Sequence, residues 1–206
     1  MKPSCGKRNS GIALIGDLPW GSHFCQFYQT RKDLLDVLIP YFKAGLESNE
    51  LCVWVTSDFL TKNSALKAME KSVPGFPDFL AKGQMEILPY TDWYLKGGSF
   101  DLKRTLSMWM EKHDEALSKG FAGMRVSGNP YWIDNKKDWD DFACYEAEIN
   151  KVIGGTKLLV LCTYSLKKCG VAEIVDVIKN HEFALAIKQG TWQIVNNPVP
   201  CHTHQL

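Results

Sequence analysis

Hydrophobic and polar positions along the chain form short apolar runs separated by longer amphipathic segments. The strand-length apolar runs lie at residues 12–16, 23–28, 51–56, 85–90, 121–126, 157–164 and 183–187. Segments with helical hydrophobic spacing lie between most of them, at residues 30–47, 60–70, 100–119, 137–152 and 170–180. Strands that are apolar on both sides and alternate with helices predict an α/β fold, with a mostly parallel central sheet and helices on both faces.

The two ends of the chain lack this pattern. Residues 1–10 are polar and unpatterned, and the last residues, 198–206, are polar and rich in proline at their start. We therefore predict one domain over residues 11–197 with loosely held ends. The 206 residues, 45% of them hydrophobic, supply enough apolar material for one well-packed domain, and two independent domains are not expected.

Charge and hydropathy argue against two classes of partner. The 24 Lys and Arg residues against 23 Asp and Glu residues leave a formal net charge of +1, and no basic patch suited to nucleic acid is evident. The longest apolar runs, such as LLVLC at 158–162, are too short to cross a bilayer, and the N-terminal segment lacks the apolar core of a signal peptide. These features predict a cytoplasmic protein that contacts neither nucleic acid nor membrane.

The seven cysteines are an odd number, which does not suit a disulfide framework. Four of them lie inside apolar or amphipathic stretches: Cys25, Cys52, Cys144 and Cys162. This placement predicts reduced, mostly buried thiols. Three potential metal ligands stand close together in the tail: Cys201, His202 and His204. Because a metal site normally needs a fourth ligand from a folded element, we predict no metal site there, and the sequence calls for no cofactor.

The stretch GDLPWGSH at residues 16–23 has the outline of a phosphate-binding loop. Gly16 and Gly21 have the right separation, but Ser22 stands where such a loop carries lysine, and His23 takes the place of the magnesium-binding Ser or Thr. The late strand KLLVLCTYS also lacks an Asp at its end to hold magnesium. We interpret the stretch as a turn built from glycine and proline, with a degenerate phosphate loop as the alternative.

Seven motifs occur in an informative order along the chain. They are GSHFCQFY, AGLESNELCVWV, YLKGGSFD, MRVSGNPYW, YEAEIN, LLVLCTYSL and NHEFALAIKQGTWQIVNN. In sequence and in order they resemble the MEDS family, the methanogen/methylotroph DcmR sensory domain, over nearly all of residues 11–197. The resemblance implies a RecA/KaiC-like three-layer sandwich, degenerate relative to the ATPases of that fold. It also implies a non-catalytic input domain that senses a small methylated or halogenated compound.

The sequence departs from the family pattern in three ways. Ser165 stands where an acid usually follows the C-x-Y of the late strand, and GNPYW at 128–132 replaces the usual GEMxW. We also see no attached output module, so the resemblance implies signalling to a separate regulatory protein, a transcription regulator or a histidine kinase. Self-association stays open.

Parallel sheets bind ligands beyond the carboxyl ends of their strands, so residues near those ends are the positional candidates for a site. We predict one ligand pocket bounded by the loops 16–23, 127–134 and 163–169. The residues predicted to take part are His23, Gln26, Tyr28, Arg125, Tyr131, Trp132, Glu146, Cys162 and Tyr164. Aromatic faces there would suit an apolar or cationic methylated ligand, with core packing as the ordinary explanation for each ring.

Several of these residues also have a structural interpretation. His23 falls on the opposite side of its strand from Gln26, so we interpret it as a loop residue at the strand's entrance. Arg125 lies in an apolar strand and needs a partner, for which we predict Glu146 on the next helix. His181 is predicted to cap the preceding helix through its C-terminal dipole.

Two other functions stay open. A nucleotide-binding protein could retain ATP without the lysine, although the missing lysine and acid predict no hydrolysis and hence no enzyme. A redox sensor would act through Cys162 and Cys169, seven residues apart across one loop, and would need an exposed thiol of low pKa.

Overall fold

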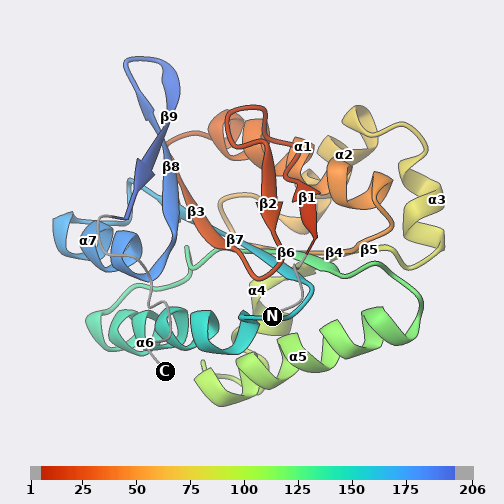
Figure 1. Cartoon of the computed structure of the whole chain (residues 1–206). Coiled ribbons are helices and arrows are strands. Elements are labelled where there is room, and N and C mark those ends of the chain that lie inside the picture. The colour runs from red at the N-terminus through yellow and green to blue at the C-terminus, as the bar shows by residue number, and fades with distance from the viewer. Residues whose placement is uncertain (1–5, 198–206) are drawn as a thin grey trace.

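Seven strands form the central sheet of the computed structural model, which describes residues 6–197 (Figure 1). Their order across the sheet is β5-β4-β6-β7-β3-β8-β9. The strands are β3 (His23–Tyr28), β4 (Leu51–Thr56), β5 (Met85–Pro89), β6 (Met124–Gly128), β7 (Leu158–Ser165), β8 (Phe183–Lys188) and β9 (Thr191–Asn196). Neighbouring strands pair in parallel except β8 and β9, which form an antiparallel hairpin at the edge. The mostly parallel sheet is as predicted.

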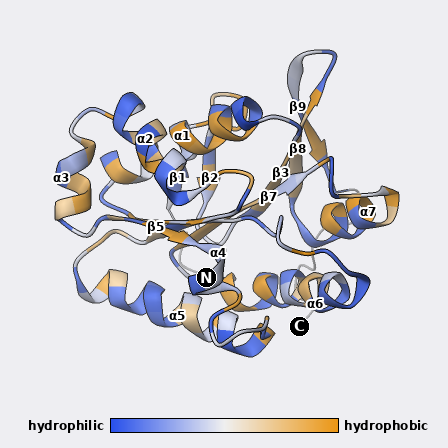
Figure 2. Ribbon diagram, turned by 180° about the vertical axis from the view of Figure 1, so that it is seen from behind, coloured by the Kyte–Doolittle hydropathy of each residue, from blue (hydrophilic) through white to orange (hydrophobic). Residues whose placement is uncertain are grey.

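Helices cover both faces of this sheet and make a three-layer sandwich (Figure 1). One face carries α1 (Arg31–Glu47), α2 (Lys62–Ser72) and α3 (Phe76–Ala81). The other face carries α4 (Tyr90–Trp93), α5 (Leu102–Ser118), α6 (Lys136–Ile153) and α7 (Val171–Asn180). Figure 2 shows apolar residues gathered on the strands, with hydrophilic residues over much of the outer surfaces of α5 and α6. The fold thus has one hydrophobic core on each side of the sheet.

Residues that precede β3 differ from the sequence-based prediction. The run 12–16, predicted as a strand, is a turn in which the carbonyl oxygen of Ile12 accepts the N–H groups of Ile15 and Gly16. Gly11 and Gly16 have φ angles of 77° and 70°, which break an extended strand at both ends. Residues 7–9 form β1 (Lys7–Asn9), which pairs with β2 (Asp17–Pro19). The folded region therefore begins before residue 11.

Two further predictions concern thiols and membranes. The cysteines at 25, 52, 144, 162 and 169 are all free, but Cys144 is exposed on α6 rather than buried. Between residues 6 and 197, none of the helices has the length and apolar character needed to span a bilayer. The predicted tail ligands Cys201, His202 and His204 lie outside the described residues.

Candidate functional site

The loops predicted to bound one pocket lie at opposite ends of the strands. Loops 127–134 and 163–169 follow β6 and β7 at the carboxyl edge of the sheet, whereas the 16–23 stretch leads into the amino end of β3. In the parallel register His23 lies beside Val160 and Tyr28 beside Ser165. The single pocket is therefore wrong, because a whole strand length separates its first wall from the other two.

The 16–23 stretch does not have the geometry of a phosphate loop. Gly16 and Gly21, with φ angles of 70° and 85°, flank the short strand β2. The stretch continues into a strand, whereas a phosphate loop connects a strand to the N-terminus of a helix. Ser22 is buried, and its backbone carbonyl accepts a hydrogen bond from Val160 of β7. These glycines lie at the two ends of β2, and the N–H of Gly21 donates to the carbonyl oxygen of Leu158 in β7.

The connection from β3 to α1 is the strand-to-helix turn where a phosphate could approach a helix N-terminus. It is only two residues long, Gln29 and Thr30. Thr30 Oγ1 accepts the N–H of Asp33 at 3.1 Å, and Asp33 Oδ2 accepts the N–H groups of Thr30 and Gln29 at 2.9 and 3.0 Å. This capping box occupies the backbone donors and adds a negative charge, so it disfavours phosphate at the same place.

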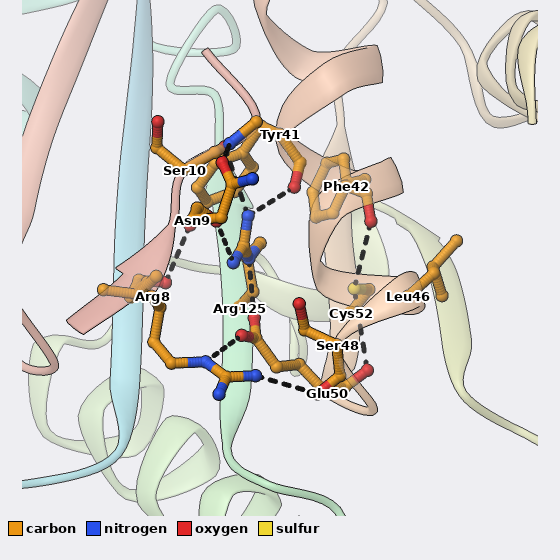
Figure 3. A network of polar contacts seen from close by, with 12 residues as sticks. Arg8, Asn9, Ser10, Tyr41, Phe42, Leu46, Ser48, Glu50, Cys52 and Arg125 are labelled. Atoms are coloured by element: carbon orange, nitrogen blue, oxygen red, sulfur yellow. Dashed lines mark hydrogen bonds and ion pairs between the residues drawn. The ribbon is translucent and has the colours of Figure 1, made fainter. Parts of the chain in front are cut away.

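Arg125 has a different partner from the one predicted (Figure 3). Its side chain is fully buried, and Nε donates a 2.7 Å hydrogen bond to Oε2 of Glu50. Its other donors bind the backbone carbonyl oxygens of Asn9, Ser10 and Tyr41. The predicted pairing with Glu146 is wrong because Arg125 faces Tyr41 of α1, whereas Glu146 belongs to α6 on the other face of the sheet.

Four buried side chains converge on the α6 face, beneath the neighbouring strands β3 and β7. We call them the buried cluster: His23, Glu146, Cys162 and His181. Oε2 of Glu146 lies 3.0 Å from Nε2 of His23 and 3.4 Å from Nε2 of His181. Sγ of Cys162 lies 3.5 Å from the same carboxylate oxygen and 3.4 Å from Nε2 of His23. These residue types can bind a transition metal.

Four elements position these side chains. His23 is the first residue of β3, and the parallel register places Cys25 beside Cys162, so His23 and Cys162 project from the same face. Glu146 lies in the C-terminal half of α6, and its side chain points toward the sheet. His181 is the C-cap of α7, and its Nδ1 lies 2.7 Å from the carbonyl oxygen of Val177. The predicted capping role of His181 is confirmed by this contact, and the ring has a second role in the cluster.

Hydrogen bonds fix which ring nitrogen of each histidine faces the cluster. Nδ2 of Asn150 donates to the carbonyl oxygen of Asn180, which leaves Oδ1 of Asn150 to accept from Nδ1 of His23 at 3.0 Å. Nδ1 of His181 likewise donates to a backbone carbonyl. Both rings therefore carry their Nδ1 proton on the outside and direct Nε2 at Glu146.

Burial and mutual contacts set the charges in the cluster. Burial lowers the pKa of His23, and the nearby charge on His181 adds to that effect. Burial alone would raise the pKa of Glu146, but hydrogen bonds and charge interactions with His181 and His23 outweigh it and lower that pKa. Burial also opposes the charge on His181, yet contacts with Cys25, Cys162 and Glu146 raise its pKa well above the usual value. The cluster favours an ionised Glu146 beside a charged His181.

A small apolar cavity lies against the cluster, between the sheet and helices α5 and α6. Its volume of about 10 Å³ offers room for about one water-sized particle. The walls include Tyr94, Leu106, Trp109, Val126 and Tyr145, and Cys162 of the buried cluster also faces it. In this conformation the cavity is far smaller than the usual small-molecule pocket, so a larger ligand would have to displace its walls.

A second small pocket, of about 20 Å³, lies at the carboxyl edge of the sheet. Two of the predicted residues, Tyr131 and Tyr164, line it together with Cys169. Burial raises the pKa of the Cys169 thiol to about 12, and it also raises that of Cys162. Neither thiol has the low pKa that the redox hypothesis requires.

The remaining predicted residues lie elsewhere. Trp132 packs against Tyr94, with ring centroids 6.1 Å apart, so it stands behind the apolar cavity rather than in the edge pocket. Gln26 is buried and donates to a backbone carbonyl of α1. The hydroxyl of Tyr28 accepts a 3.0 Å hydrogen bond from Asn129 at the end of β6. These contacts indicate that Gln26 and Tyr28 have structural roles near the carboxyl edge of the sheet.

Comparison with known proteins identifies the family and the fold of this chain. A model of the MEDS family, described as MEthanogen/methylotroph, DcmR Sensory domain, matches residues 22–182. The chain belongs to the MEDS family. Membership of this family indicates a sensory role, and no curated protein matches the chain.

Two solved structures share the fold of this MEDS domain. A KaiC-like protein from Pyrococcus horikoshii has a TM-score of 0.61 at 13% identity, with 92% of this chain and 86% of that one covered. The flagellar accessory protein FlaH from Methanocaldococcus jannaschii has a TM-score of 0.53 at 12% identity, with 88% and 79% covered. The predicted relationship to the RecA and KaiC fold is confirmed.

The buried cluster spans almost the whole MEDS match, with His23 next to its start and His181 next to its end. Sequence reasoning selected three of its members singly but missed that His181 joins them. It also missed Asn150, which orients His23. No spacing signal could have linked these positions, because the contacts form only when α6 and the end of α7 pack beneath β3 and β7.

Proposed function

We propose that this MEDS domain is a non-catalytic sensor that binds a small, weakly polar compound, methylated or halogenated, in the apolar cavity beneath β6 and β7. One observation supports the proposal above others: the cavity has apolar walls, and Cys162 of the buried cluster is one of its lining residues. Apolar walls favour a ligand with few hydrogen-bonding groups, and they disfavour nucleotide phosphates.

The small volume of the cavity determines how a ligand could enter it. At about 10 Å³ it is smaller than a compound of several heavy atoms. Such a ligand must therefore displace wall side chains, and the half-buried wall residues that could move are Leu106 and Met110 of α5 and Val152 of α6. A binding step that requires repacking couples occupancy to a change of conformation.

The cluster offers a route for that change to reach the surface. Cys162 faces the cavity and contacts Glu146, which contacts His181. His181 is followed within two residues by the β8–β9 hairpin, whose Ile187, Ile194 and Val195 are exposed. We propose that a separate regulatory protein reads this hairpin.

A thermal-shift screen tests the ligand site. Methylated amines, methyl thiols, halomethanes and nucleotides are compared on the parent and on Val126→Ile, which adds one carbon to the cavity wall. A compound at about 100 times its Kd stabilises a protein by about 2.7 kcal/mol, or about 5–10 °C for a domain of this size. We expect a compound from the first three classes to give such a shift in the parent and a smaller one in Val126→Ile.

The control is Val37→Ile on α1, a buried valine on the opposite face of the sheet. It should respond to the compound as the parent does. Equal responses from Val126→Ile and the parent, or stabilisation by nucleotides alone, would show that the ligand binds elsewhere.

A further inference from the structure

We infer that the buried cluster is a metal site, in which His23, Glu146, Cys162 and His181 bind one divalent transition-metal ion, with Zn²⁺ the best match. The inference goes beyond the sensory function. Metal-binding experiments test it independently of whether the cavity binds a small compound.

The donor atoms have the spacing that a small tetrahedral ion requires. One donor atom from each residue lies within 4.8 Å of all the others. The contacts of Glu146 Oε2 and of Cys162 Sγ within the cluster measure 3.0–3.5 Å. With metal bonds of about 2.0–2.3 Å, the ligand atoms of a tetrahedral zinc ion lie about 3.3–3.8 Å apart. A metal ion would therefore need only small shifts of these side chains.

The polar atoms at the centre of the buried cluster are not fully satisfied by the residues that the structure describes. Oε1 of Glu146 has no hydrogen-bond partner there, and Nε2 of His181, on a fully buried ring, has the 3.4 Å ion-pair contact with Oε2 of Glu146. Buried polar atoms are almost always satisfied, so such atoms call for an explanation. A cation at the centre of the cluster supplies one, because it accepts lone pairs from Nε2 and from the carboxylate at once.

The second layer of contacts has the arrangement of a metal-binding site. Nδ1 of His23 donates to Asn150, and Nδ1 of His181 donates to the carbonyl oxygen of Val177. Both rings are thereby fixed with Nε2 directed inward. Metal-bound histidines are oriented in this way, through an outer hydrogen bond from the other ring nitrogen.

The donor set narrows the choice of metal. Two imidazoles, one thiolate and one carboxylate combine nitrogen, sulfur and oxygen, which suits the borderline character of Zn²⁺ and does not suit Mg²⁺ or Ca²⁺. Four protein ligands complete a tetrahedron, as in structural zinc sites. Binding would release two protons to solvent, one from the thiol of Cys162 and one from Nε2 of the charged His181.

The experiment uses the full-length chain, stripped with a chelator and titrated with Zn²⁺ and with Co²⁺. We expect one ion per chain, a higher melting temperature with Zn²⁺, and visible bands of tetrahedral Co²⁺ with a near-ultraviolet sulfur-to-cobalt charge-transfer band. The charge-transfer band reports directly on a cysteine ligand. A stripped parent that is folded and takes up neither ion would overturn the inference without any variant.

Variants assign the site. Cys162→Ala should lose the charge-transfer band, whereas the matched controls Cys169→Ala and Cys144→Ala should keep it. Asn150 contacts the outer ring nitrogen of His23 and would not bind the metal itself. Asn150→Ala should therefore weaken zinc affinity about 10–100-fold and keep one ion per chain. A tail variant that replaces Cys201, His202 and His204 should bind as the parent does. Loss of the bound ion in the tail variant, or its retention with the charge-transfer band in Cys162→Ala, would place the metal outside the cluster.

Discussion

Arg125→Ala is expected to destabilise the fold by about 3–5 kcal/mol, the scale for removing one partner of a buried ion pair. The change leaves the fully buried carboxylate of Glu50 with the half-buried Arg8 as its one charged partner within residues 6–197. It also removes the donors to the carbonyl oxygens of Asn9, Ser10 and Tyr41. Urea denaturation followed by circular dichroism gives the free energy of unfolding of variant and parent.

Two matched variants separate burial from charge. Arg8→Ala removes the other guanidinium on Glu50, but its side chain is 25% exposed and Arg125 remains, so its cost should be clearly smaller. Lys136→Ala breaks an exposed pair on α6 with Asp140 and should change stability by no more than about 0.5 kcal/mol. Should Arg125→Ala unfold at the same urea concentration as the parent, the buried network contributes nothing to stability.

Gly128→Ala is expected to destabilise the domain by about 1–3 kcal/mol, the usual cost of overpacking. Gly128 ends β6, and a Cβ placed there would overlap the hydroxyl of Tyr94 and lie 3.2 Å from its Cζ. Tyr94 cannot retreat easily, because it is 1% exposed and packed against Phe142 and Tyr145. Thermal and urea unfolding measure the effect.

A double-mutant cycle with Tyr94→Phe tests this explanation. Removing the hydroxyl should recover part of the loss, with a coupling energy of about 0.5–3 kcal/mol. Gly154→Ala is the control, since the nearest atom to a built Cβ is the carbonyl oxygen of Asn150, one helical turn earlier, at 3.7 Å, and its φ is −57°. Additive effects of Gly128→Ala and Tyr94→Phe would contradict the steric account.

The alternation of apolar runs and amphipathic segments was enough to predict the layers of the fold. Several short or polar elements escaped it, including the three-residue strands β1 and β2. The short helices α3 and α4 have too few turns to show a periodicity, and β9 carries mostly exposed side chains, so its pattern resembles a polar turn. The opposite error occurred at residues 12–16, where a strand was predicted and a turn is found. Apolar side chains that pack from a turn give the same sequence pattern as those of a short strand.

Site prediction failed where it depended on which face of the sheet a side chain meets. Arg125 alternates with Met124 and Val126 along β6, but both faces are apolar, so the sequence could not tell which helix covers which face. The same ambiguity hid the link between Glu146 and the two histidines. His23 and Cys162 were both among the predicted site residues, but the sequence could not show that they meet, because their contact depends on strand order and β3 and β7 are far apart in the chain.

The stiffness of the sheet is uneven because of how the β8–β9 hairpin is attached. β8 pairs with β3 at only two positions, Ala184 and Leu185, and β9 pairs with β8 alone among the described strands. Backbone amides toward the hairpin tip can therefore exchange with solvent through local opening, whereas those of β3, β6 and β7 require disruption of the core. The softest part of the sheet thus begins within a few residues of His181, one of the most deeply buried side chains in the domain.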